Sequence, residues 1–222
     1  MASKIYLDKL PQVVKENHKH NDKYYTAAPL HPAVLVQDAN FPFQDIKFLI
    51  DLLASITKQP KIRVSVPKKF RKLFKEKAST NIILKTPLPL WAEILSYIPF
   101  LANAAYASLD FKNLGNFVVS VGTGPNLFVV PHITTFHIAV INKKLRGTKS
   151  LQFALVRPEI VVVLNNRQTY ESIKTVRKQS LGKPTFYVKH LEQLEPIVKK
   201  ALSIYNKMTF RWVEDLKEIK QE

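Results

Sequence analysis

The chain has 222 residues, and its 34 lysines and arginines outnumber its 17 aspartates and glutamates, which gives a formal net charge of +17. Its hydrophobic content of 46% is enough for a packed core and excludes a disordered basic tail, while the absence of cysteine excludes disulfides, thiolate metal sites and cysteine nucleophiles. A charge so far from zero costs self-repulsion unless a polyanion neutralises it, so the composition favours a nucleic-acid partner over a basic surface that binds nothing.

The first predicted segment is an extended basic and polar arm over residues 1–44, which is polar at first and then interrupted by prolines. Apolar residues at a spacing of three to four predict a helix over Asp45–Ile56. Lys61–Val66 alternates apolar and polar side chains, which predicts a half-buried strand with a basic outer face. The next helix is predicted to begin at Pro67. Its apolar stripe contains Phe70, Leu73, Phe74 and Ala78.

The second half of the chain is predicted to be rich in strands. Leu88–Tyr106 is apolar and interrupted by Pro99, which indicates two helical pieces. Apolar runs predict strands at Phe117–Val121, Leu127–Val130, Phe136–Asn142, Leu151–Arg157, Ile160–Leu164 and Pro184–Val188. Helical spacing predicts helices over Arg167–Leu181 and Leu191–Tyr205, and a charged helix closes the chain over residues 207–222.

These elements predict a single α/β domain over residues 45–206. The strand–helix–strand succession at residues 158–188 is a βαβ unit, which favours an α/β sheet over an all-β fold. We expect a mixed sheet that contains this C-terminal βαβ unit, followed by a helical C-terminus. The unbroken apolar run Ile160–Leu164 predicts a strand that is covered on both faces.

The positive charge is concentrated in three stretches. Residues 59–77, 143–149 and 167–183 contribute +7, +4 and +4 of the net charge of +17. Lysine and arginine clusters of this kind form the electrostatic footprint of a nucleic-acid site. The predicted RNA contacts are Lys61, Arg63, Lys68, Lys69, Arg71, Lys72, Lys75, Lys77, Lys143, Lys144, Arg146, Lys149, Arg167, Lys174, Arg177 and Lys178.

No motif in the chain indicates catalysis, a cofactor or a metal. Gly122-Thr123-Gly124 completes neither a dinucleotide fingerprint nor a P-loop. His132 and His137 are five residues apart, which places them on opposite faces of one strand, and no acid lies within twenty residues of them. We therefore predict that the protein is not an enzyme and that these histidines belong to the core or the surface. No apolar run is long enough to span a bilayer, and the N-terminus has no apolar signal core, so we expect an intracellular protein without a membrane partner.

Four short segments resemble one protein family. Arg157–Asn165 (RPEIVVVLN), then a basic helix and Lys183–Val188 (KPTFYV), is similar to the late βαβ unit of the second protein family of the small ribosomal subunit. Asn81–Leu88 (NIILKTPL) and Gly115–Thr123 (GNFVVSVGT) are similar to two earlier segments of that family, in the same order. The helix after Gly-Thr, the Arg-Trp-x-Gly-Gly-x-Leu-Thr-Asn signature and the inserted hairpin of the family have no counterpart here. The resemblance implies a structural, rRNA-binding protein that acts in translation beside neighbouring proteins, in a mitochondrial or cytoplasmic ribosome.

Two other resemblances leave alternatives open. The strand Val118–Val121, the Val129–Pro131 step and the strand pair in 151–164 resemble the noncatalytic accessory subunit of the tRNA-splicing endonuclease, which implies tRNA as the partner and a nuclear location. Asn113-Leu-Gly115 resembles the acyltransferase domains of 2-oxoacid dehydrogenases, but their Asp-His-Arg segment is absent. We predict an RNA-binding structural component of a ribonucleoprotein and keep an RNA-processing subunit and an acyltransferase-like enzyme as alternatives.

Overall fold

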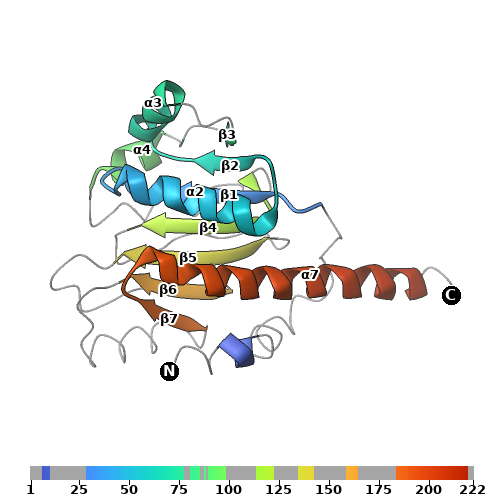
Figure 1. Ribbon diagram of the computed structural model, residues 1–222. Helices are drawn as coiled ribbons and strands as arrows, with labels where there is room; N and C mark the ends of the chain where they lie inside the picture. The colour runs from blue at the N-terminus through green and yellow to red at the C-terminus, as the bar shows by residue number, and fades with distance from the viewer. Residues whose placement is uncertain are drawn as a thin grey trace.

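Seven strands form one parallel sheet. The computed structural model describes residues 7–10, 29–77, 81–85, 88, 90–98, 114–122, 135–142, 159–164 and 184–219. Within these ranges the strand order is β3-β2-β1-β4-β5-β6-β7, and each of the pairings is parallel (Figure 1). The strands are β1 (Pro32–Val36), β2 (Ile62–Ser65), β3 (Ile82–Leu84), β4 (Phe117–Gly122), β5 (Phe136–Asn142), β6 (Ile160–Leu164) and β7 (Thr185–Val188).

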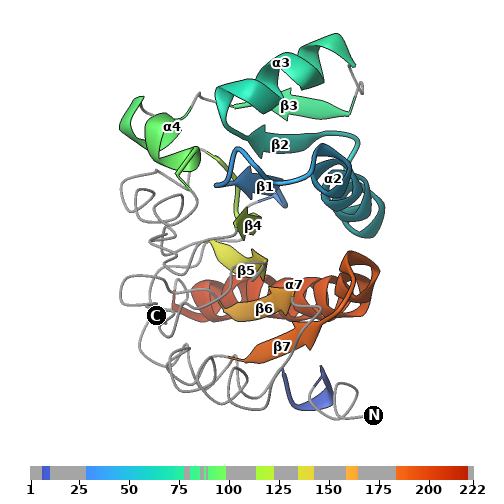
Figure 2. The same ribbon diagram turned by 90° about the vertical axis from the view of Figure 1, so that its left-hand side faces the viewer.

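Helices lie on both faces of this sheet. The helices are α2 (Phe43–Thr57), α3 (Lys68–Glu76), α4 (Leu90–Ser96) and α7 (Leu194–Ile219), and a 3₁₀ turn, η2 (Leu191–Gln193), precedes α7. Residues 7–10 are also helical. α2, α3 and α7 contribute side chains to one core cluster, whereas α4 packs into a separate cluster on the other face. Figure 2 shows α4 on the opposite side of the strands from α2.

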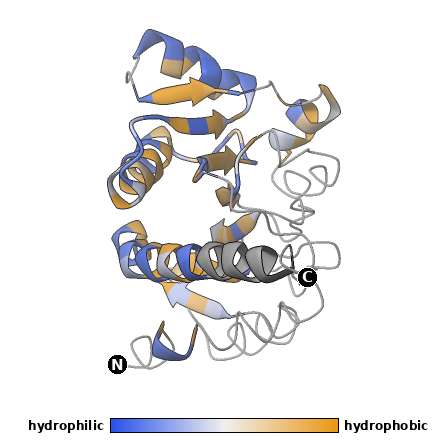
Figure 3. Ribbon diagram, turned by 90° about the vertical axis from the view of Figure 1, so that its right-hand side faces the viewer, coloured by the Kyte–Doolittle hydropathy of each residue, from blue (hydrophilic) through white to orange (hydrophobic). Residues whose placement is uncertain are grey.

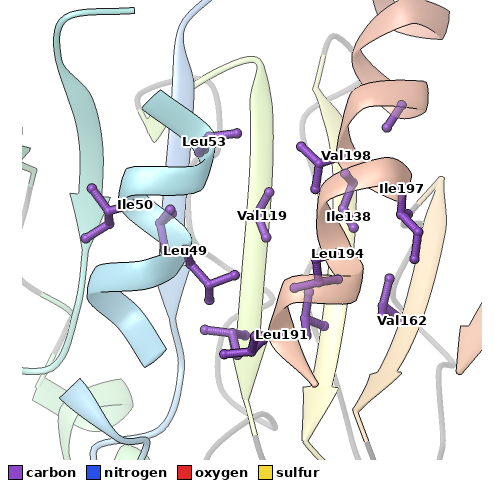
Figure 4. Close-up of a cluster of buried hydrophobic side chains, with 14 of the residues drawn as sticks. Leu49, Ile50, Leu53, Val119, Ile138, Val162, Leu191, Leu194, Ile197 and Val198 are labelled. Carbon is purple, nitrogen blue, oxygen red and sulfur yellow. The ribbon is translucent and has the colours of Figure 1, made fainter. Parts of the chain in front are cut away.

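The main core lies between the sheet and the pair α2 and α7. Alternate strand residues such as Val119, Ile138 and Val162 point toward the apolar sides of both helices (Figure 4). At the start of β4 and β5, the Phe117 and Phe136 rings stack 5.5 Å apart, and the Tyr205 ring of α7 meets both edge-on. Aromatic contacts of this geometry add to the burial energy and fix where α7 lies on the sheet.

The α/β class, the single domain and the helical C-terminus are confirmed. Where the sequence predicted a mixed sheet, the described strands are all parallel. Every residue of Ile160–Leu164 is buried, so this strand is covered on both faces as predicted. β6 and β7 are neighbours and parallel, as the ends of a βαβ unit must be, and the expected helix Arg167–Leu181 between them lies outside the described residues. The predicted strands Leu127–Val130 and Leu151–Arg157 also lie outside them.

The predicted N-terminal arm over residues 1–44 was wrong for its last third. Pro32–Val36 forms β1 in the middle of the sheet, between β2 and β4, with all five residues buried. The Asn116 side chain, which lies just before β4, holds the segment that leads into β1. It accepts a hydrogen bond from the His31 backbone N–H at 2.7 Å and donates one to the Pro29 carbonyl at 2.9 Å. The sequence did not reveal β1 because a strand covered on both faces shows no alternation of apolar and polar residues. Pro32 is tolerated because it is the first residue of the strand.

Two boundaries also differ from those predicted. The predicted break at residue 207 is absent, because α7 is one continuous helix from Leu194 to Ile219. Pro67 precedes α3 as its N-cap residue and is not the first helical residue. The second predicted piece of Leu88–Tyr106, beyond Pro99, lies outside the described residues, as do most of the first forty-four residues.

No helix in the described ranges is long and apolar enough to cross a membrane.

Candidate nucleic-acid interface

The structure describes half of the predicted RNA contacts. Those in the first basic stretch lie around β2 and α3 and are Lys61, Arg63, Lys68, Lys69, Arg71, Lys72, Lys75 and Lys77. Those in the other two stretches lie outside the described residues and are Lys143, Lys144, Arg146, Lys149, Arg167, Lys174, Arg177 and Lys178. The candidate interface is therefore built from the first stretch alone.

α3 separates its apolar and cationic residues sharply. Phe70 and Phe74 lie one turn apart and are buried in the main core, and Leu73 packs beside them. The exposed side carries Lys68, Lys72 and Lys75, and the Lys72 side chain is 81% exposed. Figure 3 shows α3 as a largely hydrophilic helix with an apolar patch. The helix contains five basic residues and one acid in nine positions, so its outer surface is a strong cationic ridge.

The amino end of α3 is held by a residue of another helix. Pro67 makes no side-chain cap, and the first turn of α3 contains no acid. The Glu93 carboxylate of α4 instead accepts a hydrogen bond from the Lys68 backbone N–H at 2.8 Å. A carboxylate at this end satisfies an otherwise open donor and complements the helix dipole. α4 therefore fixes the position from which the cations of α3 project.

Several of the cations have contacts within the fold. The Lys69 ammonium donates to the Ala39 carbonyl oxygen at 3.2 Å, and the Arg71 guanidinium donates to the Lys85 carbonyl oxygen. Lys72 forms a solvent-exposed ion pair with Glu76 at 3.9 Å, which contributes little. Among the described residues, Lys61, Lys68 and Lys75 form no salt bridge, so their charges remain uncompensated locally.

Arg63 does not lie on the outer surface of α3. It is half-buried on β2, beside Ala33 of β1, and it points toward the α4 side of the sheet. Partial burial, and then the charges of Arg63 and Lys85, lower the pKa of His31. The positive field thus reaches both faces of this sheet edge, with the denser cation array on α3. Lys85 was missed because it is a lone lysine in the sequence, and only the β2–β3 pairing brings it beside Arg71.

The outer side of α4 has a different character. Leu90, Ile94, Tyr97 and Ile98 expose large apolar surfaces, with Leu90 77% exposed. These positions follow a helical spacing, but they offer no charge to a polyanion. The exposed side of α4 is therefore apolar, whereas the exposed side of α3 is cationic.

The carboxyl ends of β1 and β4 mark the point where the chain reverses its direction across the sheet. Open α/β sheets often bind ligands in a crevice at such a point. Here Gln37 and Asp38 are 0% and 1% exposed, and Asp38 Oδ1 accepts a hydrogen bond from the Asn40 N–H at 2.8 Å. Burial raises the pKa of Asp38, and the Asn40 N–H and the Lys69 charge oppose that shift. The Asp38 side chain supports the turn at Asn40, and neither Gln37 nor Asp38 faces solvent. No pattern in the sequence marks these two residues.

His137 is a core histidine, which is one of the two placements that the sequence analysis predicted. It lies on β5, and its Nε2 is 2.6 Å from the Ser120 Oγ of β4. Both residues are 0% exposed, and burial lowers the pKa of His137 to about 3, so the ring is neutral. The Glu159 carboxylate accepts a hydrogen bond from the backbone N–H of His137. A serine and a histidine in contact resemble a nucleophile and its base, but a substrate cannot reach this pair in the folded sheet. His132 lies outside the described residues.

Comparison with known proteins leaves the family open, because no family model, no curated protein and no solved structure matches the chain.

Proposed function

We propose that the protein binds structured RNA as a structural component of a ribonucleoprotein and that α3 supplies the main phosphate contacts. The observation that carries this proposal is the division of α3 into a buried aromatic side and an exposed side with lysines and a single acid. Burying Phe70 and Phe74 accounts for the helix, whereas the exposed Lys68 and Lys75 form no salt bridge among the described residues and the Lys72–Glu76 ion pair is exposed and weak. Their repulsion is relieved when a polyanion binds.

The spacing of the exposed lysines suits a phosphate backbone. Lys68, Lys72 and Lys75 lie four and three residues apart, which places them on one side of the helix. At a rise of 1.5 Å per residue they span about 10 Å along the axis. One strand of a duplex carries a charge roughly every 3.4 Å of its axis, so this span faces about three phosphates. Contacts of this kind give affinity and orientation but little sequence preference.

A ribosomal role is the form of this proposal that the sequence resemblance supports. The similar segments contain β3, β4, β6 and β7, which are four of the seven strands of the parallel sheet. The resemblance therefore supports a shared sheet, and the cations of α3 stand outside it. An accessory subunit of an RNA-processing complex would use the same surface. The acyltransferase alternative draws no support from His137, which is buried against Ser120.

The test is purification at low salt, followed by a binding titration at increasing salt. We expect ribosomal RNA to copurify, or tRNA if the protein belongs to a processing complex. If the protein neutralises about 6–10 phosphates, its affinity should fall about 10³–10⁵-fold between 50 and 200 mM salt, with a shallower slope for single strands. Polyglutamate of matched charge is the control. An affinity that ignores salt, or equal affinity for polyglutamate, would refute RNA as the partner.

A further inference from the structure

A pocket of about 240 Å³ lies between α2, α3 and the first residue of β3. Its apolar wall consists of Phe43, Ile50, Phe74 and Ile82. The Phe43 and Phe74 ring centroids are 4.9 Å apart, with the ring planes tilted by 49°. Phe74 is buried, whereas Phe43 is only half-buried, so part of the Phe43 ring is open to a ligand. The pocket therefore offers an aromatic surface at the base of the cationic helix.

The rim of this pocket is polar and carries two lysines. The Lys77 ammonium lies over the Phe43 ring, 5.7 Å from its centroid. Lys47 Nζ is 2.6 Å from Asp51 Oδ2, and both side chains are about half exposed, so this ion pair is weak and can open. Gln44 is exposed at the same rim and offers both a hydrogen-bond donor and an acceptor.

We propose that this pocket takes one unstacked base of a single-stranded or looped RNA segment, an inference that rests on the proposed function. The base stacks on Phe43, where the Lys77 ammonium now lies. Lys77 and Lys47 then move to the phosphates on either side of that base. The Gln44 amide and the Asp51 carboxylate face the hydrogen-bonding edge of the base.

The chemistry of the pocket fits a nucleotide better than other anions. Every base presents a π face, and aromatic side chains are the surfaces on which RNA-binding proteins stack extruded bases. An acidic peptide would match the lysines but would leave the Phe43 ring unused and would meet Asp51 with like charge. The volume is below the ~300–1,000 Å³ of sites for drug-sized ligands, which suits a single base.

The pocket lies at the carboxyl end of the helix that carries the exposed lysines. Phe74 and Lys77 belong to the same segment as Lys68, Lys72 and Lys75 but lie on its opposite side, so an RNA strand that follows the α3 lysines reaches the pocket around the carboxyl end of the helix. Phosphate contacts along α3 would thereby be followed by one base contact. The stacked base would fix the position of the RNA strand along α3, whereas phosphate contacts alone allow the strand to slide from one phosphate to the next.

The experiment compares a short unstructured RNA with a ribose-phosphate chain of the same length that carries no bases. Fluorescence anisotropy gives the affinity of the full-length protein for both, and free AMP serves as a third ligand. We expect the protein to prefer the RNA by about tenfold, as one base stacked on an aromatic ring implies. Phe43→Leu should abolish that preference and leave the salt dependence of binding unchanged. Phe48→Leu is the matched control, because Phe48 is also half-buried on α2 but does not line the pocket.

The outcomes separate the pocket from the proposed function. If the protein binds both chains equally but in a salt-dependent manner, RNA binding stands and the base pocket is refuted. The pocket is also refuted if Phe43→Leu keeps the wild-type preference, or if it and Phe48→Leu weaken the preference alike. If free AMP binds as tightly as the RNA, the ligand of the pocket is a free nucleotide, and an RNA strand as its ligand is refuted. If neither chain binds, both the pocket and the proposed function are refuted.

Discussion

α2 and α3 are neighbouring helices on the same face of the sheet, and they differ in charge more than in packing. Both bury an apolar stripe in the main core, through Leu49, Ile50 and Leu53 in α2 and through Phe70 and Phe74 in α3. α2 has one basic and two acidic residues among fifteen. α3 has five basic residues and one acidic residue among nine.

This difference separates the features of α3 that the fold needs from those that it does not need. The apolar stripe alone suffices to attach a helix to this sheet, because α2 packs with almost no net charge. The exposed Lys68, Lys72 and Lys75 add repulsion without packing into the core, which is why we propose that RNA binds there.

Truncating the stripes should show that both helices depend on burial. We expect Phe70→Ala in α3 to lower the free energy of unfolding by about 3–5 kcal/mol and Leu49→Ala in α2 to lower it by about 2–5 kcal/mol, because each leaves a cavity in the main core. Urea unfolding followed by circular dichroism measures both. Losses below about 1 kcal/mol for Phe70→Ala would show that α3 is not anchored by its aromatic residues.

Reversing the charge of α3 should affect RNA binding and spare the fold. We expect Lys68→Glu, Lys72→Glu and Lys75→Glu together to weaken RNA binding at least about 100-fold and to lower the salt slope by about three. The melting temperature should stay within a few degrees of the wild type, because all three side chains are exposed.

The control for charge reversal changes the same number of lysines away from α3. Lys58→Glu, Lys189→Glu and Lys207→Glu are exposed positions that alter the net charge equally. A comparable loss of affinity in this control would mean that net charge, and not the surface of α3, attracts the RNA.

Acid should destabilise the sheet that both helices share, because it contains the buried His137. Burial lowers the pKa of His137 to about 3 from 6.5, so the unfolded chain takes up the proton first as the pH falls. Stability is therefore full above about pH 6.5 and declines by about 1.4 kcal/mol per pH unit below it, until about pH 3. Between pH 7 and 5 we expect a loss of about 2 kcal/mol in urea unfolding.

His137→Gln isolates this contribution. The variant removes the titrating ring but keeps a group that can hydrogen-bond to Ser120, so its stability should change about 2 kcal/mol less than that of the wild type over the same pH range. Equal pH dependence in the two proteins would contradict the neutral, buried state of His137.

The smallest predicted effect concerns the start of α3. α2 has its own first-turn acid, Asp45, whereas α3 relies on Glu93 of α4. Glu93→Gln should cost about 0.5–1 kcal/mol, because a neutral acceptor replaces the carboxylate at the helix terminus. Amide exchange of the first turn of α3 should accelerate accordingly. Glu76→Gln, at the other end of α3, should cost nothing by comparison, since an acid there opposes the helix dipole.

The sequence by itself determined those elements whose pattern is local. The spacing of apolar residues predicted α2 and α3 to within a few residues, and alternation predicted β2. The unbroken run Ile160–Leu164 predicted a strand buried on both faces. Composition and clustering also identified the lysines of α3, because a charge excess is a property of the chain and needs no fold to be seen.

Only the tertiary structure decided the features that join distant segments. The five residues of β1 carry no alternation, so only their pairing with β2 and β4 places them at the centre of the sheet and not in an arm. Glu93 reaches the start of α3 across 25 residues, and Ser120 reaches His137 across 17. The pocket at Phe43 and Phe74 exists because helix packing brings the two rings together. Contacts of this kind depend on where whole helices and strands pack. Many weak interactions together determine that packing, and no local sequence pattern encodes it.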